Sequence, residues 1–238
     1  MKILMSGGTG LLGRKLKHLD PSIISMTRKE LDVSNYDEVV DQIKRNKPDT
    51  FLHLAAFTDN RKLEKDPKRA ILDNIIGTAN VTISCMGSNN VRLVYVSTDY
   101  VYSGKKGLYA EEDEILPVNK YAWSKLGGEC AVRQYENSLI IRTSFGPSSF
   151  PYNKAFVDMW TSKDTVDVIA PMILKASKSS ITGILNIGTV RKNMFEYASK
   201  LDKNVKKAIR NEFTNSTPFD TSLDLSKYKS LFVTNKDQ

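Results

Sequence analysis

Two tyrosines in the sequence are each followed four positions later by a lysine, a spacing that could support proton transfer. The pairs are Tyr121 with Lys125 and Tyr102 with Lys106. Chance also produces such pairs in a chain with 10 tyrosines and many lysines, so their context must separate them. Gly104 lies inside the second pair and disfavours a helix, whereas Tyr121 begins a helical run in which positions i and i+4 share one face. We therefore expect Lys125 to lower the pKa of the Tyr121 phenol and assist proton exchange.

Hydroxyl groups follow an apolar segment at 91–97, which we expect to be a buried strand. Ser97 and Thr98 end this segment, and Asp99 and Tyr100 come directly after them. A hydroxyl at such a strand end could donate a hydrogen bond to a substrate carbonyl. Thr98 is therefore a candidate partner of Tyr121.

A glycine-rich turn follows the first apolar segment, 2–6, and precedes a helix-like run that starts at Leu11. Gly7, Gly10 and Gly13 match the spacing G-x-x-G-x-x-G. Glycines permit a tight turn and let the backbone approach a diphosphate, whose charge is stabilised by the N-terminus of the next helix. The position between a strand and a helix predicts a dinucleotide-binding turn.

The residues after the second expected strand, 23–27, bear on the choice of cofactor. An acidic residue there would bind the ribose 2′-hydroxyl of NAD, whereas a basic residue could pair with the 2′-phosphate of NADP. Arg28 and Lys29 occupy this place, so the sequence favours NADP(H). Glu30 and Asp32 are close by and keep NAD(H) as an alternative.

Apolar strands alternate with helical segments along the chain, which predicts a doubly wound parallel α/β sheet of the Rossmann type. Further strands are expected at 50–56, 138–142 and 184–187, and helices at 34–44 (with Ser34 as N-cap), 67–86, 121–134 and 164–176. Ligands of such folds bind beyond the carboxyl ends of the strands, here along Gly7, Ala55, Ser97 and Thr143. We expect an acidic, solvated loop at 103–119 and a solvated basic helix around 203–210.

Several stretches together resemble the extended short-chain dehydrogenase/reductase superfamily, and within it dTDP-4-dehydrorhamnose reductase and its relatives. They are GGTGLLG from Gly7, ELDVSNYDEV from Glu30, HLAAFTD from His53, NIIGTAN from Asn74, VSTDYVYSG from Val96, PVNKYAWSKLGGE from Pro117 and IIRTS from Ile140. DTSLDLSK from Asp220 is similar to the C-terminal segment of that family. The close resemblance covers about residues 1–145, and the region between is shorter than usual. We therefore expect a Rossmann core at 1–145 and a reduced substrate-binding part at 146–238, with 164–190 returning to the sheet.

The resemblance implies a role for particular residues. Tyr121 would protonate the substrate carbonyl as hydride arrives from the nicotinamide, Lys125 would bind the nicotinamide ribose, and Thr98 would hydrogen-bond the same carbonyl. The implied cofactor-binding residues are Gly7, Gly10, Leu11, Leu12, Gly13, Arg28, Asp32, Val33, Ala55, Ala56, Tyr121 and Lys125. The implied substrate residues are Thr98, Asp99, Tyr100 and Phe145.

Departures from related families narrow the implied activity to reduction of a nucleotide-linked 4-keto-6-deoxy sugar by NADPH. Nucleotide-sugar dehydratases carry a glutamate where Tyr100 stands, and GDP-fucose synthases carry a cysteine just after the position of Ser97. Two alternatives stay open: an NADP-binding regulatory subunit without catalysis, because such a subunit of methionine adenosyltransferase resembles this family, and a bifunctional epimerase/reductase.

Composition excludes several other classes of protein. Apolar runs are too short to cross a bilayer, and Met1-Lys2 leads directly into a strand without a signal peptide, so we expect a cytoplasmic protein that does not bind membranes. The 2 cysteines and 2 histidines have no metal-ligand spacing. The net charge of +8 is not accompanied by interleaved aromatic residues, so we expect no nucleic-acid partner. A nucleotide-diphosphate sugar is the expected partner, and a homodimer is compatible with the sequence.

Overall fold

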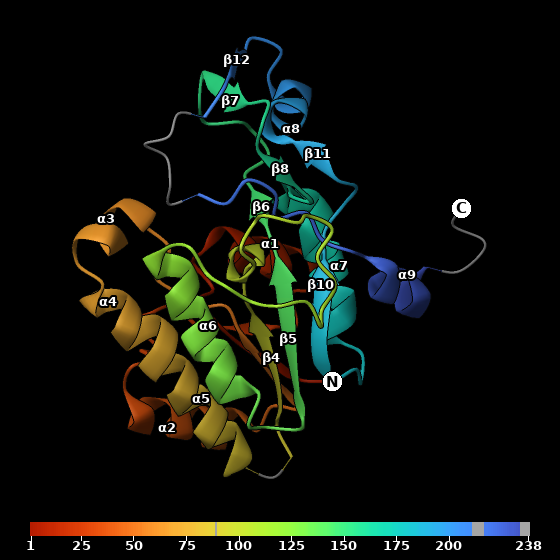
Figure 1. Cartoon of the computed structure of the whole chain (residues 1–238). Helices are drawn as coiled ribbons and strands as arrows, with labels where there is room; N and C mark the ends of the chain where they lie inside the picture. Colours follow the sequence, from red (N-terminus) through yellow and green to blue (C-terminus); the bar gives the residue numbers. More distant parts are fainter. Residues whose placement is uncertain (89, 211–216, 234–238) are drawn as a thin grey trace.

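The computed structural model describes residues 1–88, 90–210 and 217–233, and its centre is a six-stranded sheet (Figure 1). The order of the strands is β10-β5-β4-β3-β1-β2. Their bounds are β1 Ile3–Ser6, β2 Ile24–Ser25, β3 Thr50–His53, β4 Arg92–Val96, β5 Ser138–Thr143 and β10 Gly183–Ile187. Every pairing between them is parallel. The predicted doubly wound parallel sheet is therefore confirmed.

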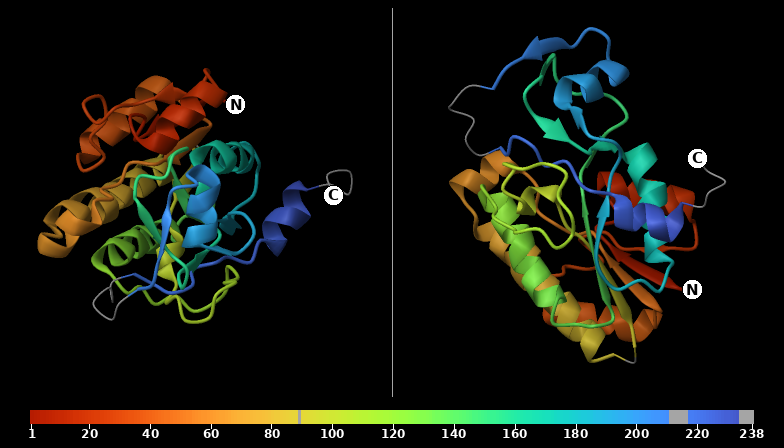
Figure 2. Two further views of the ribbon diagram at one scale, coloured as in Figure 1. Left: turned by 90° about the horizontal axis from the view of Figure 1, so that it is seen from above. Right: turned by 45° about the vertical axis from the view of Figure 1, so that its right-hand side comes forward.

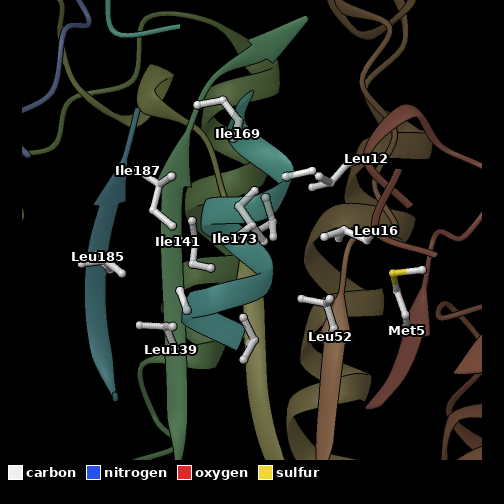
Figure 3. Packing of buried hydrophobic residues seen from close by; sticks show 14 of the residues in the cluster. Met5, Leu12, Leu16, Leu52, Leu139, Ile141, Ile169, Ile173, Leu185 and Ile187 are labelled. Carbon is white, nitrogen blue, oxygen red and sulfur yellow. The ribbon is translucent and has the colours of Figure 1, made fainter. Parts of the chain in front are cut away.

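Side chains alternate between two buried cores because successive residues of a strand point to opposite faces. Ile3 and Met5 of β1 pack in one core, and Leu4 packs in the other. The first core lies under α1 (Leu11–Leu19) and α7 (Val166–Ser177) and contains the residues labelled in Figure 3. The second core lies under α2 (Tyr36–Asn46), α5 (Gly77–Met86) and α6 (Lys120–Val132). Apolar burial on both faces fixes the carboxyl ends of the strands relative to one another.

Two of the expected helices are present but differ in detail. Asn35, not Ser34, caps α2, because the Asn35 side chain accepts hydrogen bonds from the backbone of Asp37 and Glu38. The Ser34 hydroxyl instead donates to Asp32. The helix expected at 67–86 consists of α4 (Lys68–Ala70), the π-helical turn η1 (Ile71–Ile76) and α5, and α3 (Asn60–Lys65) precedes it.

Short strand pairs and one helix lie beyond the carboxyl ends of the sheet, at the top of Figure 1 and in the right-hand view of Figure 2. The pairs are β6 (Phe145–Gly146) with β9 (Asp164–Thr165), β7 (Lys154–Phe156) with β12 (Lys206–Ala208), and β8 (Trp160–Thr161) with β11 (Lys192–Asn193). Helix α8 (Met194–Leu201) joins this group, and α9 (Ser226–Phe232) contacts β10. Within 164–190, β10 is a strand of the central sheet and α7 packs against that sheet, as expected. The division of the chain at residue 145 stays a prediction.

The basic helix expected around 203–210 is wrong. The chain there forms β12, which pairs in parallel with β7. Val205 is buried with Ala155 and Ala198, and Lys206 and Lys207 are exposed. Strand pairing and the burial of Val205 therefore outweigh the helix propensity of the lysine-rich sequence.

The segment 103–119 is irregular, as expected, but it is not a solvated loop throughout. Tyr109 and Glu111 are buried, and Tyr109 forms an isolated parallel bridge with Leu223. The Glu111 carboxylate accepts a hydrogen bond of 2.9 Å from the backbone of Asn186 in β10. The prediction of a solvated segment failed because these partners come from distant parts of the chain.

Candidate active site

A cavity of about 450 Å³ lies at the carboxyl edge of the sheet, beside the place where the strand order reverses between β1 and β3. Crevices at such a switch point are the usual ligand sites of open α/β sheets. Predicted site residues in its wall are Gly7, Gly10, Leu11, Leu12, Gly13, Ala56, Thr98, Asp99, Tyr100, Tyr121, Lys125 and Phe145. Residues expected to have catalytic, cofactor and substrate roles therefore lie around one space.

The glycine turn forms one wall of this cavity and is packed too closely for side chains. Gly7 has a φ of +75°, and a Cβ there would lie 2.7 Å from the Ala55 nitrogen. A Cβ on Gly13 would lie 2.5 Å from the Gly7 carbonyl oxygen. Gly10 caps α1, so the free backbone N–H groups of the first helical turn lie at this wall. The arrangement is that of an anion-binding turn at the N-terminus of a helix.

A second cavity, of about 230 Å³, continues from Gly7 and Gly10 towards Arg28. The remaining predicted cofactor residues line it, namely Arg28, Asp32, Val33 and Ala55, and Ala56 lines both cavities. The Arg28 guanidinium donates two hydrogen bonds to Asp73, of 2.8 and 3.0 Å, and contacts Asp32. Burial raises the pKa of Asp73, and Arg28 opposes that rise. Arg28 is thus close to the cofactor region but is already paired with carboxylates.

Thr98 and Tyr121 meet in the larger cavity. Thr98 follows β4, and its side chain caps the short helix η2 (Asp99–Val101) by accepting a hydrogen bond of 3.2 Å from the backbone of Tyr100. Tyr121 lies in the first turn of α6, which Asn119 caps through a hydrogen bond of 2.8 Å from Ala122. The nearby Thr98 hydroxyl acts to lower the pKa of the Tyr121 phenol, against the larger effect of burial.

Lys125 lies one turn along α6 from Tyr121 and is almost fully buried. Its ammonium donates a hydrogen bond of 2.9 Å to the Val96 carbonyl and lies 4.1 Å from the centre of the Tyr95 ring. Burial lowers the pKa of Lys125 to about 7, and the nearby Glu129 carboxylate opposes that shift. The lysine is therefore held at the end of β4.

The expected lowering of the Tyr121 pKa by Lys125 is wrong for this structure. Burial raises the pKa of Tyr121, and the Asp99 carboxylate raises it further. The physical reason is that the Lys125 ammonium lies on the Val96 carbonyl and the Tyr95 ring. The Tyr121 phenol is protonated near neutral pH with or without this shift, and protonated is the state that a general acid requires.

The other tyrosine–lysine pair is separated, as its glycine suggested. The Tyr102 hydroxyl donates to Ala110 and accepts a hydrogen bond from Arg142, while the Lys106 ammonium pairs with Asp113 at 2.7 Å. Neither Tyr102 nor Lys106 is part of the wall of the larger cavity. Tyr102 and Lys106 thus serve the packing of the 103–119 segment.

The chain matches the family model described as the RmlD substrate binding domain over residues 1–174. This chain belongs to that family. Curated relatives include a dTDP-4-keto-6-deoxy-D-glucose reductase of Streptomyces niveus, 31% identical over 70% of this chain, and a dTDP-4-dehydrorhamnose reductase of Sinorhizobium fredii, 31% identical over 73% of it. Each alignment covers only 60% of the length of the relative.

Solved structures of the family resemble nearly the whole chain. A hypothetical dTDP-4-dehydrorhamnose reductase from Sulfolobus tokodaii is 28% identical with a TM-score of 0.87, over 99% of this chain and 96% of the other. A dTDP-4-dehydrorhamnose reductase from Bacillus anthracis, in complex with NADP, is 26% identical with a TM-score of 0.85, over 98% and 94% of the two chains. Both likenesses include the C-terminal part that the sequence suggested to be reduced.

Several residues in or near the cavity wall were not among the residues predicted from the sequence. Lys163 joins the wall from the turn between β8 and β9, and Asp73 holds Arg28 from η1. Thr221 donates a hydrogen bond of 2.6 Å to the buried Asp99. The quoted segment DTSLDLSK contains Thr221 and was the available signal for it. Lys163 and Asp73 stand in no recognisable motif.

A buried ion pair that does not line the cavity connects the elements that carry the site residues. The Arg142 guanidinium of β5 pairs with the Glu129 carboxylate of α6 at 2.8 Å, and both side chains are almost completely buried. Ser97 donates a hydrogen bond of 2.6 Å to the same carboxylate. The network therefore joins β4, β5 and α6, the three elements that carry or flank Thr98, Tyr121 and Lys125.

The described ranges, 1–88, 90–210 and 217–233, contain neither a metal-binding cluster nor a bilayer-spanning helix. No group of three or more histidine, cysteine, aspartate or glutamate side chains is arranged there to hold a metal ion. None of the helices in those ranges combines the length and the apolarity that a bilayer crossing needs.

Proposed function

We propose that this protein reduces a nucleotide-linked 4-keto-6-deoxy sugar, of the kind that dTDP-4-dehydrorhamnose reductases use. The observation that carries the proposal is that Thr98, Tyr121 and Lys125 line the same cavity as the glycine turn. Membership of the RmlD family supports it. The named relatives act on dTDP-linked keto sugars, which gives the substrate class.

The residues at the glycine turn fit a dinucleotide such as NADPH. The turn leaves no room for side chains at Gly7 and Gly13, so a diphosphate can approach the backbone at the start of α1. Arg28 lies in the adjoining cavity, where it could meet a 2′-phosphate in addition to Asp73. The NADP complex of the Bacillus anthracis relative supports NADP(H) over NAD(H). When bound, this cofactor supplies the hydride.

Tyr121 then acts as the general acid of the reduction. Its phenolic proton passes to the carbonyl oxygen at C4 of the sugar, so that the ketone becomes a secondary alcohol. Thr98 donates a hydrogen bond to the same oxygen and helps to place it. Lys125 binds the nicotinamide ribose, and Asp99, Tyr100 and Phe145 face the sugar. General acid assistance of this kind typically contributes about 10²–10⁴-fold to the rate.

The test is NADPH oxidation with a panel of dTDP-, UDP- and GDP-linked 4-keto-6-deoxy sugars, followed by identification of the product by NMR. We expect turnover with at least one member and a product with a new hydroxyl at C4. Nucleotide binding without NADPH oxidation across the whole panel would refute the proposal and favour a regulatory subunit. Solvent deuterium at the carbons beside C4 would identify an additional epimerase activity.

A further inference from the structure

Lys163 occupies a fixed place in the wall of the active-site cavity, on the turn between β8 and β9. Its backbone N–H donates to the Thr161 hydroxyl at 3.0 Å, and its carbonyl accepts a hydrogen bond of 2.8 Å from Lys192. Its side chain passes Gly146, where an added Cβ would lie 3.1 Å from the Lys163 Cε. The lysine is therefore positioned by its main chain and by a glycine that makes room for it.

The ammonium of Lys163 has no ionic or hydrogen-bonding partner in the part of the chain that the structure describes. The ammonium faces the ring of Tyr197, with Nζ 6.0 Å from the ring centre. Burial lowers the pKa of Lys163, and the charge of Asp99 acts from a distance in the opposite direction. Neighbouring lysines differ, because Lys192 pairs with Asp164 and Lys125 donates to Val96. A partly buried cation without a partner is costly, and an anionic ligand would offset that cost.

Lys163 lies at the substrate end of the cavity. Strand β9 starts at the next residue, Asp164, which pairs with Phe145 of β6. Asp99 lines the same cavity, interacts electrostatically with Lys163, and accepts a hydrogen bond of 3.2 Å from Thr98. Lys163 thus stands beside Phe145 and close to the reacting centre, whereas the glycine turn lies at the carboxyl end of β1.

We propose that Lys163 binds the diphosphate of the nucleotide-sugar substrate. The inference rests on the proposed function, since it assumes a sugar whose C4 carbonyl lies at Thr98 and Tyr121. In such sugars the diphosphate is attached at C1, on the opposite side of the ring from C4. A lysine side chain is about as long as the sugar ring is wide, so Lys163 can reach this diphosphate while C4 lies at Tyr121. Lys163 would select sugars that carry a phosphate at C1 and would orient C4 towards Tyr121.

The test is the affinity of three variants for nucleoside diphosphates, measured by calorimetry. Lys163→Met removes the charge and keeps an unbranched side chain, and Lys163→Arg keeps the charge. Lys154→Met is the matched control, because Lys154 is exposed on β7 outside the cavity and loses the same charge. The probes are dTDP, UDP and GDP, each compared with its nucleoside, together with NADPH.

We expect Lys163→Met to weaken diphosphate binding about 10- to 100-fold, the usual value of a hydrogen bond to a charged group. Binding of the nucleosides and of NADPH should stay within about twofold, Lys163→Arg should recover part of the loss, and Lys154→Met should match the unmodified protein. Circular dichroism and the melting temperature check the fold of each variant.

Three results would overturn the inference. One is unchanged diphosphate affinity in Lys163→Met. This includes the case in which only the pH profile of turnover shifts, because Asp99 has lost a nearby positive charge. Another is an equal loss of NADPH affinity, which would assign Lys163 to the cofactor. The last is an unmodified protein that binds no diphosphate more tightly than its nucleoside. Turnover is not needed for these measurements, so they separate this inference from the proposed reduction.

Discussion

The Asp99 carboxylate accepts a hydrogen bond of 2.6 Å from the Thr221 hydroxyl, across 122 residues of sequence. Asp99 is 1% exposed, and burial raises the pKa of its carboxyl to about 6 in spite of this hydrogen bond. The C-terminal segment around Thr221 therefore closes over the residue that follows the catalytic candidate Thr98. Asp99 links the fold of the C-terminal part to the electrostatics of Tyr121.

The raised pKa of Asp99 predicts a specific dependence of stability on pH. The folded protein holds the Asp99 proton up to about pH 6, whereas the unfolded chain releases it near the ordinary value of 3.8. The contribution of Asp99 to stability should therefore fall as the pH rises through this window, by about 3 kcal/mol in all, and stay level above it. Asp99→Asn cannot lose that proton. Its free energy of unfolding, relative to the unmodified protein, should rise by about that amount between roughly pH 4 and pH 7.

Denaturant unfolding of both proteins across this pH range measures the difference. Parallel stability curves for Asp99→Asn and the unmodified protein would show that Asp99 titrates normally and would contradict the prediction. Asp158→Asn is a suitable control, since Asp158 is a partly buried acid of the same C-terminal part whose carboxylate accepts from the backbone of Arg210.

The pairing of Arg28 with Asp73 predicts how cofactor preference can be changed. Asp73→Asn removes a negative charge from the cavity near Arg28 and weakens its hold on the guanidinium. We expect the ratio of kcat/KM for NADPH to that for NADH to increase by about 10-fold, because a freer Arg28 can pair with a 2′-phosphate. Steady-state kinetics with each cofactor measures the ratio. Lys29 is exposed and, unlike Arg28, lines neither cavity, so Lys29→Ala should leave the ratio nearly unchanged. A fall in the Asp73→Asn ratio would refute this view of Arg28.

The buried pair Arg142 and Glu129 should dominate the stability of the site. Glu129→Gln leaves the Arg142 charge buried without its carboxylate, which typically costs about 3–5 kcal/mol. The exposed pair Arg45 and Asp41 is the matched control, and Asp41→Asn should cost less than about 1 kcal/mol. Urea unfolding compares the two variants. Equal losses would mean that the buried network contributes no more than a surface contact.

Local patterns predicted the sheet and most of the cavity wall because their signals lie within short stretches. The glycine turn, the hydroxyl at the end of β4 and the i, i+4 pair on α6 are each encoded within a few consecutive residues. Parallel strands then bring these separate stretches to the same edge of the sheet. All of these residues line the two cavities. Their roles stay predictions.

The features that sequence reasoning missed depend on distant partners. Arg28 looked available for a phosphate, but Asp73 reaches it across 45 residues. Lys125 was expected to act on Tyr121, but its ammonium lies on a strand carbonyl 29 residues earlier. Lys206 and Lys207 favoured a helix prediction, but the chain there pairs with β7 as a strand. Such contacts are set by tertiary packing, which local propensity does not contain.

In the proposed reaction, Tyr121 supplies the proton for carbonyl reduction. The most direct measurement is single-turnover NADPH oxidation by Tyr121→Phe, with the 4-keto sugar nucleotide that the unmodified protein uses, alongside NADPH affinity measured by fluorescence. Because the phenylalanine has no proton to donate, we expect a rate at least about 100-fold lower, with the affinity for NADPH changed by less than about threefold. A Tyr121→Phe rate close to that of the unmodified protein would contradict it.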